Sequence, residues 1–442
     1  MPRSKKPLPE SQPLNLVKAK VKRPAVAKNA ISLFSGAGGD SIGLKQAGYN
    51  VVAFSEFKKS AIATHLKEFP SSRLLVCPET ASADITKIPD ETFEYYSGQI
   101  DIIFAGFSCQ GFSNAGKKRI DDPRNEMVYE FVRATKIIKP KYIIGENVAG
   151  LLSRKGKDPK TGKLRPVIDI IRDIFIEIGY NITYKVLKAT DFGVPQERKR
   201  LIIVGCKADL GHPHMPWDSL VSPTFPKNPS IRSFLETHLE GAIEFNEDNI
   251  PEGLSPHYTN GETQTKRYWI TTNATKATGK PHPNLIRLVN GIRNKSSKEK
   301  EEEGEDDTPL TIEGGLISFG VRKSAYHGQI LDPDMPSKTI ICTYGTCPRL
   351  FVGLHNPDEG KFWVRCLSIK ELGQIQGFPA EYQWQGNEKE IITQIGNAVP
   401  PALCESVVRT LPNITFKTQP QTNTLTEKDD KDDKEEEEDN EN

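Results

Sequence analysis

The 442-residue sequence has no apolar run near the roughly 20 residues that a membrane-spanning helix needs. Its first ten residues, MPRSKKPLPE, also lack the apolar core of a signal peptide. The seven cysteines include no CxxC pair, so neither a disulfide framework nor a zinc ribbon is indicated, and we expect free thiols and no metal site. Together these absences predict a soluble intracellular protein, cytoplasmic and nucleoid-associated in a bacterium or nuclear in a eukaryotic host.

A large net charge is also missing, since the formal value is only +1. The two ends are nevertheless strongly charged: residues 1–30 carry eight Lys or Arg and one Glu, and residues 427–442 carry eleven Asp or Glu and three Lys. Such segments are typical of disorder. The body between them is close to neutral, so any phosphate-binding surface must come from local basic clusters such as GKKR at 116–119 or QERKR at 196–200.

Short apolar runs alternate with helical patterns from residue 29 to about 210. The runs AISLF, NVVAF, DIIFAG and KYIIGENV are each followed by a glycine turn, a charged segment or a helix-like stretch. This alternation predicts an α/β fold with a doubly wound, mostly parallel sheet. Beyond residue 210 proline becomes frequent and the periodicity fades, and short β-like runs return only after residue 311.

These changes of pattern divide the chain into five parts. We expect a basic disordered tail (1–28), an α/β domain (29–210), a smaller β-rich second domain (211–389) with an acidic insertion (295–307), a C-terminal segment (390–412), and an acidic disordered tail (413–442).

The first glycine turn, FSGAGGDSIG at 34–43, stops short of a dinucleotide fingerprint. The third glycine of GxGxxG is replaced by Ser41, which weakens a nicotinamide interpretation. What remains is a strand that ends in a glycine turn at a helix N-terminus, where backbone N–H groups can face a ligand. Glu56 ends the next strand, where an acid can hold ribose hydroxyls, and Asp84 lies at a third strand edge.

Cys109, in GFSCQGFS, follows the strand DIIFAG at the carboxyl edge, where doubly wound sheets hold their chemistry. A buried structural cysteine is the plain alternative. Glu146 at the end of the next strand, with Arg198 and Arg200, favours chemistry. An acid, a thiol and two arginines suit attack on carbon 6 of cytosine, after which carbon 5 can take a methyl group from a sulfonium donor; nearby positive charge would favour the thiolate.

In this order the motifs FSGAGG, CQGFS, GENV, QERKR, QGFP and QIGNAVPP resemble those of the cytosine-5 DNA methyltransferases that use S-adenosylmethionine. The resemblance runs from Ile31 to about Leu411 and implies a Rossmann-like methyltransferase fold. It implies that 29–210 is the catalytic cofactor-binding domain, that 211–389 is the target-recognition domain, and that 390–412 returns to the catalytic domain. It implies catalytic roles for Cys109, Glu146, Arg198 and Arg200. It implies cofactor contacts by Phe34, Gly36, Gly38, Glu56, Asp84, Ile85, Asn397 and Val399.

The resemblance also implies a monomer acting on duplex DNA, with a flipped-out cytosine and, as a functional partner, a cognate restriction endonuclease. The expected DNA-binding residues are Gln110, Ser113, Lys117, Lys118 and Arg119 in a mobile catalytic loop, and Thr339 with Ile340 in the recognition region. One departure is Ser108, which stands where the family usually has proline before the nucleophile. Two alternatives stay open: a tRNA cytosine-5 methyltransferase of the same fold, and a catalytically inactive DNA-binding regulator.

Overall fold

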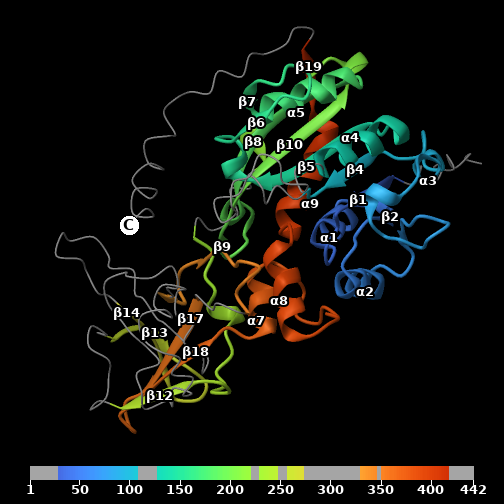
Figure 1. The fold of residues 1–442 in the computed structure, drawn as a ribbon. Coiled ribbons are helices and arrows are strands. Elements are labelled where there is room, and N and C mark those ends of the chain that lie inside the picture. The colour runs from blue at the N-terminus through green and yellow to red at the C-terminus, as the bar shows by residue number, and fades with distance from the viewer. Residues whose placement is uncertain are drawn as a thin grey trace, which may run out of the picture.

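The computed structural model describes residues 28–107, 127–220, 228–246, 256–272, 329–345 and 350–417 (Figure 1). The predicted acidic insertion 295–307 lies outside the described residues, as do nearly all of both predicted tails. Ser108, Cys109 and the expected DNA-binding residues of the catalytic loop lie outside them as well.

A seven-stranded sheet forms the first half of the molecule, with strand order β3-β2-β1-β4-β5-β10-β8. Strands β3 to β5 run parallel, and β10 runs antiparallel to both β5 and β8. The strands are β1 (Asn29–Leu33), β2 (Asn50–Phe54), β3 (Arg73–Leu74), β4 (Ile102–Ala105), β5 (Tyr142–Val148), β8 (Tyr180–Lys188) and β10 (Lys199–Lys207). This confirms the predicted doubly wound, mostly parallel sheet, and its order reverses direction between β1 and β4, where such sheets bind ligands.

Helices cover both faces of this sheet because alternate strand residues point to opposite sides. On β4, Ile103 and Ala105 face one apolar core, whereas Ile102 and Phe104 face the other. The first core is completed by α3 (Asp90–Glu94), α4 (Met127–Ile138) and α5 (Val167–Glu177), and the second by α1 (Gly39–Gln46) and α9 (Pro401–Thr410). A further helix, α2 (Lys59–Glu68), contacts α8 (Glu388–Asn397).

A six-stranded sheet occupies the other half of the molecule (Figure 1). Its order is β12-β18-β17-β14-β13, and β15 pairs in parallel with β17. The strands are β12 (Ile243–Asn246), β13 (Pro256–Glu262), β14 (Tyr268–Thr272), β15 (Gln329–Ile330), β17 (Leu350–Asn356) and β18 (Lys361–Cys366). Side chains of α7 (Ile369–Ile375) and α8 share its core, whereas α9 belongs to the first sheet.

Three two-stranded pairs complete the fold. Two of them connect distant segments: β9 (Gln196–Glu197) pairs in parallel with β16 (Ser337–Lys338), and β11 (His212–His214) pairs with β19 (Thr415–Lys417). The third is the hairpin of β6 (Lys155–Lys157) and β7 (Leu164–Pro166). The pair of β9 and β16 joins the segment before β10 to the segment that follows β15, in the second half. The pair of β11 and β19 lies with the first sheet, since β11 contacts both β8 and β10.

Candidate active site

The glycine turn after β1 adopts the backbone that its sequence requires. Phe34, Gly36 and Gly38 have positive φ angles of 57°, 56° and 89°, in the left-handed region that glycine adopts at little cost. An added Cβ at Gly36 would meet no described atom within 4 Å, so the turn faces open space there. Gly38 is the N-cap of α1, and no side chain of the described chain caps that helix. The turn therefore leaves room for a ligand at a helix N-terminus.

Glu56, directly after β2, is bound to this turn through its carboxylate. Oε2 accepts a hydrogen bond from the Gly36 N–H at 3.0 Å, and Oε1 accepts from the N–H groups of Phe57 and Lys58 at 2.8 Å each. Phe57 exposes 69% of its surface beside the acid. Sequence reasoning missed this residue, although an aromatic side chain directly after the acid at a strand end was a usable signal for a base-stacking face.

Asp84 and Ile85 lie beyond β3, at the third strand edge. The Asp84 carboxylate caps the short helix Ile85–Lys87 by accepting hydrogen bonds from the Thr86 N–H and hydroxyl, at 3.1 and 2.8 Å. Ile85 is buried, and its carbonyl accepts a hydrogen bond from Arg133 of α4 at 2.9 Å. The main chain at this edge is thus fixed, while the Asp84 side chain stays partly exposed.

Gly106, directly after β4, is where three of the predicted motifs meet. A Cβ added there would lie 3.8 Å from the Phe34 carbonyl oxygen, 3.9 Å from Glu146 Oε2 and 3.9 Å from a methyl group of Val399. The glycine turn, the GENV acid and the C-terminal segment therefore converge on one point. Asn397, at the end of α8, is exposed close to Val399 in sequence.

Glu146 and Arg200 form an ion pair between neighbouring strands, with Arg200 Nε 2.8 Å from Glu146 Oε1. Both side chains are largely buried, at 10% and 13% exposure, and water screens such a pair weakly. The next residue, Asn147, donates a hydrogen bond to the Phe107 carbonyl at 2.9 Å. The strand that carries the acid is therefore tied to the chain two residues before Cys109.

Arg198 is 1% exposed and does not share the contact of Arg200 with Glu146. It donates hydrogen bonds to the carbonyls of Ile340 at 3.2 Å and of Gly396 and Ala398 at 3.0 Å, while its Nε has no partner among the described residues. Burial acts to lower the pKa of Arg198, yet a guanidinium stays protonated in proteins. Arg198 therefore holds three segments of the chain together beside the Glu146–Arg200 ion pair.

Two buried glutamines, Gln196 and Gln376, connect the same segments by further hydrogen bonds. Gln196 accepts a hydrogen bond from the Ile340 N–H at 3.1 Å and donates to the Gln376 side chain, which donates to the Ala398 carbonyl at 2.6 Å. The Ile340 side chain is completely buried, so only Thr339 of the predicted DNA-recognition pair is partly exposed. The Thr339 hydroxyl donates to the Glu197 carbonyl.

Two further polar groups behind the glycine turn were missed by sequence reasoning. Asp40 is 3% exposed, and burial raises its pKa to about 7 against a hydrogen bond from Ser32 that lowers it. His65 lies 3.0 Å from the Ser41 hydroxyl and stacks on Phe54, and burial lowers its pKa to about 3, so its ring is neutral. The sequence did not single out Asp40 or His65, because neither burial nor ring stacking can be inferred from residue type.

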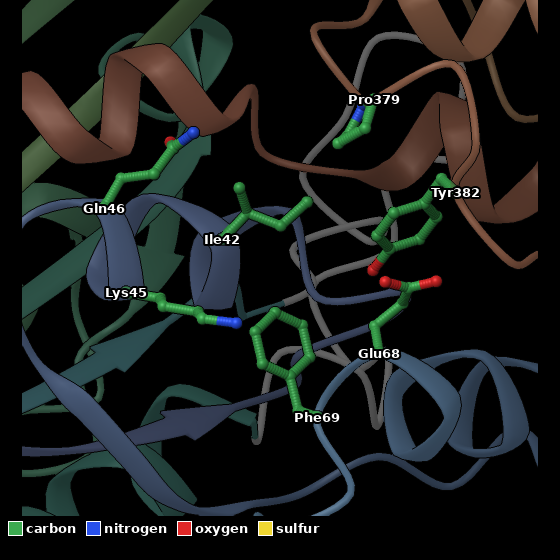
Figure 2. Close-up of a pocket in the computed structure, with 7 residues that line it drawn as sticks. All are labelled: Ile42, Lys45, Gln46, Glu68, Phe69, Pro379 and Tyr382. Carbon is green, nitrogen blue, oxygen red and sulfur yellow. The ribbon is translucent and has the colours of Figure 1, made fainter.

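A hollow of about 410 Å³ lies on the outer side of α1 (Figure 2). Figure 2 shows the Tyr382 hydroxyl close to the carboxylate of Glu68, with Phe69 and Lys45 across the hollow. Tyr382 donates its hydroxyl hydrogen to the Ala37 carbonyl in the glycine turn, so this wall supports the turn from behind. None of its lining residues belongs to the predicted site, and the hollow is therefore distinct from the place where Gly106 and Glu146 meet.

The residues at the edge of the first sheet fit S-adenosylmethionine. The open space at Gly36 admits a ligand next to backbone N–H groups, the Glu56 carboxylate is placed to accept hydroxyl hydrogen bonds, and Phe57 offers an exposed ring.

No helix in the described part of the chain has the length and apolar character to cross a membrane.

The C-5 cytosine-specific DNA methylase family matches residues 28–413. Among curated relatives, the type II methyltransferase M1.HphI of Haemophilus parahaemolyticus is 30% identical over 85% of this chain and 84% of its own length. M.PspPI of Psychrobacter is 30% identical over 87% of this chain and 79% of its own length.

Two solved structures share the fold. A putative DNA modification methyltransferase encoded within an E. coli prophage has a TM-score of 0.51 at 21% identity, covering 88% of this chain and 99% of its own. The Dnmt2 methyltransferase of S. pombe has a TM-score of 0.53 at 15% identity, covering 88% and 98%. The chain therefore belongs to the C-5 cytosine-specific DNA methylases, and it is a DNA (cytosine-5-)-methyltransferase that uses S-adenosylmethionine as methyl donor.

Proposed function

We propose that the protein methylates a flipped-out cytosine within a specific duplex DNA sequence, through a covalent adduct with Cys109. The observation that carries this proposal is the convergence at Gly106, where the Phe34 carbonyl and Glu146 Oε2 lie 3.8 and 3.9 Å from one point. The cofactor turn and the acid thus share one site, and Cys109 follows three residues later in the chain. Two peptide units limit its Cα to about 7.6 Å from that of Phe107.

Glu146 and Arg200 prepare the base for attack in this proposal. Glu146 gives a proton or a strong hydrogen bond to ring nitrogen 3, which makes carbon 6 electrophilic, and Arg200 holds both Glu146 and the carbonyl oxygen at carbon 2. The 2.8 Å ion pair in a largely buried setting supports this assignment, because a preorganised charge is worth more where water is excluded. Arg198 acts through its neighbours, as a positioning residue for the strand that presents Arg200.

The Cys109 thiolate forms a bond to carbon 6, and the displaced electron pair makes carbon 5 a nucleophile. S-adenosylmethionine, which the glycine turn and Glu56 would hold, would supply the methyl group to carbon 5 and would be left as the neutral thioether. A base then removes the proton from carbon 5, the carbon 5–carbon 6 double bond re-forms and the thiolate leaves.

Cofactor contacts follow the geometry of the turn. We assign Gly36, Gly38 and the Phe34 main chain to the cradle, Glu56 to the ribose hydroxyls, and Asp84 with Ile85 to the adenine edge. Asn397 and Val399 close the pocket from the C-terminal side. Phe57 is added to this set as the ring that stacks on adenine, since it is the exposed aromatic next to Glu56.

DNA is held by elements outside the cofactor pocket. We propose that residues 211–389, which include the six-stranded sheet, form the target-recognition domain, and that the loop carrying Gln110, Ser113 and Lys117 to Arg119 closes over the flipped base. Thr339 is the recognition-pair side chain with exposed surface, so we assign it to DNA and Ile340 to the core that supports it. Flipping costs a few kcal/mol, which phosphate and base contacts offset.

A role in restriction-modification is part of the proposal, because the curated relatives carry the name type II methyltransferase. The enzyme would then act as a monomer and protect DNA against a cognate endonuclease without binding that endonuclease. Bisulfite sequencing of plasmid DNA from expressing cells would give both the position and the sequence of the methylated sites. Methylated transfer RNA with unmethylated plasmid in the same cells would instead favour the tRNA enzyme.

The mechanism is tested by trapping. Duplex DNA with 5-fluorocytosine at the target has no proton to lose from carbon 5, so the wild type should form a stable adduct at Cys109 that mass spectrometry detects. Cys109→Ala should abolish both the adduct and tritium transfer from labelled S-adenosylmethionine while still binding the cofactor. Cys77→Ser is the matched control and should behave as wild type; methyl transfer by Cys109→Ala at the normal rate would overturn the mechanism.

A further inference from the structure

The hairpin of β6 and β7 begins soon after the strand that carries Glu146. Residues 154–165, RKGKDPKTGKLR, contain six Lys or Arg and a single acid, Asp158. Neither the glycine turn nor the cysteine turn includes this segment. It is a strongly basic segment that the predicted catalytic and cofactor motifs do not use.

The single acid of the hairpin is used internally. Asp158 is 4% exposed and accepts hydrogen bonds from Arg165 at 2.7 Å and from the Lys160 N–H at 2.8 Å. The hydrogen bond from Arg165 is the main cause that lowers the pKa of Asp158 to about 2. A backbone hydrogen bond from the Gly162 N–H to the Asp158 carbonyl, at 2.8 Å, closes the turn. The carboxylate therefore shapes the turn and offers no negative charge to solvent.

Two of the basic residues anchor the hairpin to α5. Arg165 pairs with Asp173 at 2.7 Å, and Lys160 pairs with Glu177, one helical turn further along the same helix. Figure 1 shows β6 and β7 beside α5, and both strands contact that helix. The hairpin is thus a fixed element with a defined outer side.

Three further lysines of the hairpin, Lys155, Lys157 and Lys163, extend into solvent. All three are exposed, and none forms an ion pair with any residue that the structure describes. The register pairs Lys155 with Pro166 and Lys157 with Leu164, so the two lysines of β6 point to the same face of the ribbon. The Lys157 stem lies 3.8 Å from the Cβ position of Gly162, which brings its charge to the turn beside Lys163.

The position of the hairpin relates it to the active site. Lys155 lies seven positions after Val148, the last residue of β5, and even a fully extended chain of that length spans at most about 25 Å. The intervening helix Ala149–Leu151 shortens this reach and contacts β10, which carries Arg200. Duplex DNA carries one charge per about 1.7 Å of axis, so a duplex centred on the Glu146–Arg200 pair presents many phosphates within that range.

We propose that Lys155, Lys157 and Lys163 form a phosphate-binding edge that holds the DNA backbone next to the active site, independently of the target-recognition region. The inference rests on the proposed function, since it takes duplex DNA as the substrate. Point charges on flexible stems suit sequence-independent phosphate contacts. The hairpin therefore adds affinity and salt dependence without adding sequence discrimination.

The test compares two triple variants of the full chain. Lys155→Gln, Lys157→Gln and Lys163→Gln remove the proposed contacts; Lys136→Gln, Lys139→Gln and Lys207→Gln remove three lysines at the opposite edge of the same sheet, where β5 begins and β10 ends. Binding to target and non-target duplexes is measured between 50 and 200 mM salt. We expect the hairpin variant to reduce the slope of log affinity against log salt by about 2 to 3, at about 0.9 per phosphate contact, and the control variant to leave the slope unchanged.

The ratio of target to non-target affinity should stay at its wild-type value in both variants. An unchanged slope in the hairpin variant, or an equal fall in the control, would overturn the proposal. A fall in the target to non-target ratio would assign the lysines to base recognition, and loss of transfer RNA binding with duplex binding intact would assign the hairpin to RNA; both results contradict a DNA phosphate edge. Methylation of duplex DNA by the wild type in the same assay tests the proposed function separately.

Discussion

The seven-stranded sheet and the six-stranded sheet differ in what lies at their centres. The first is enclosed by two apolar cores, and its strands alternate between them residue by residue. The second contains a fully buried ion pair, in which Arg365 donates to both carboxylate oxygens of Glu371 at 2.8 and 2.7 Å. Apolar burial stabilises without a preferred direction. A buried ion pair stabilises the fold only when all of its hydrogen-bonding partners are in place.

The partners of that pair show what it organises. Arg365 also donates to the carbonyls of Glu236, His238 and Cys366, while Glu371 accepts from the N–H groups of Glu236 and Ser368. A loop, a strand and a helix start are therefore fixed by two side chains. The difference between the halves is that the second adds to its apolar core a buried ion pair whose backbone partners lie about 130 positions earlier in the chain.

The largest expected effect comes from breaking the buried ion pair of Arg365 and Glu371. Arg365→Met leaves the Glu371 carboxylate buried without its partner, and we expect a loss of about 3–5 kcal/mol in the free energy of unfolding. Urea unfolding measures it. The double variant Arg365→Met, Glu371→Gln has no unpaired charge and should recover part of the loss; a single variant within 1 kcal/mol of the wild type would contradict the account.

The next expected effect concerns Asp40, a buried acid in α1 beside the first sheet. Burial raises the pKa of Asp40 to about 7 in the folded chain, against 3.8 as the ordinary value. Between these values the unfolded state releases a proton that the folded state retains, so stability falls as pH rises from about 4 to about 7.

Asp40→Asn removes that dependence while keeping an oxygen that can accept the Ser32 hydrogen bond. The variant should therefore gain on the wild type across this pH window, by at most about 4 kcal/mol, and the difference should level off above pH 7. Thermal unfolding of both proteins from pH 5 to pH 8 measures the gain. A difference that is constant with pH would show that Asp40 does not titrate in this range.

The smallest effect compares two arginines that are two residues apart at the junction of the halves. In Arg198→Lys a single ammonium group replaces the guanidinium that donates hydrogen bonds to three carbonyls. We expect a loss of about 1–2 kcal/mol in the free energy of unfolding. In Arg200→Lys the charge beside Glu146 is kept, so stability should change little while kcat for methyl transfer falls. The reverse pattern, with Arg198→Lys slowing the chemistry at unchanged stability, would place Arg198 at the base.

Much of the first sheet and of its edge could be predicted from the sequence. Apolar runs of four to seven residues gave the parallel strands, and the glycine turn with Glu56 gave the cofactor edge, because these features depend on neighbours in the chain. The approach of Arg200 to Glu146 follows from the pairing of β10 with β5. The order of the apolar runs along the chain is sufficient to predict a contact when the two residues lie on strands that neighbour each other in the sheet.

The contacts of Arg198 could not be predicted in this way. Its acceptors lie 142 to 200 positions along the chain, and backbone carbonyls have no residue type to recognise. The interior position of Ile340 has the same origin, since it depends on a core formed by α7, α8 and the second sheet. Phe57 is the opposite case, because its exposure beside Glu56 would have been visible had aromatic residues after strand-end acids been considered.

The packing of α9 on α1 has a consequence for synthesis of the protein. A Cβ at Gly39 would lie 2.3 Å from the Val399 carbonyl oxygen, and one at Gly43 would lie 2.6 Å from Cys404, so the two helices touch backbone to backbone. The thiol of Cys404 donates to the carbonyl of Asp40, 364 positions earlier. Because α9 is synthesised more than 350 positions after α1, the glycine turn before α1 can reach its final packing only after nearly all of the described chain has left the ribosome.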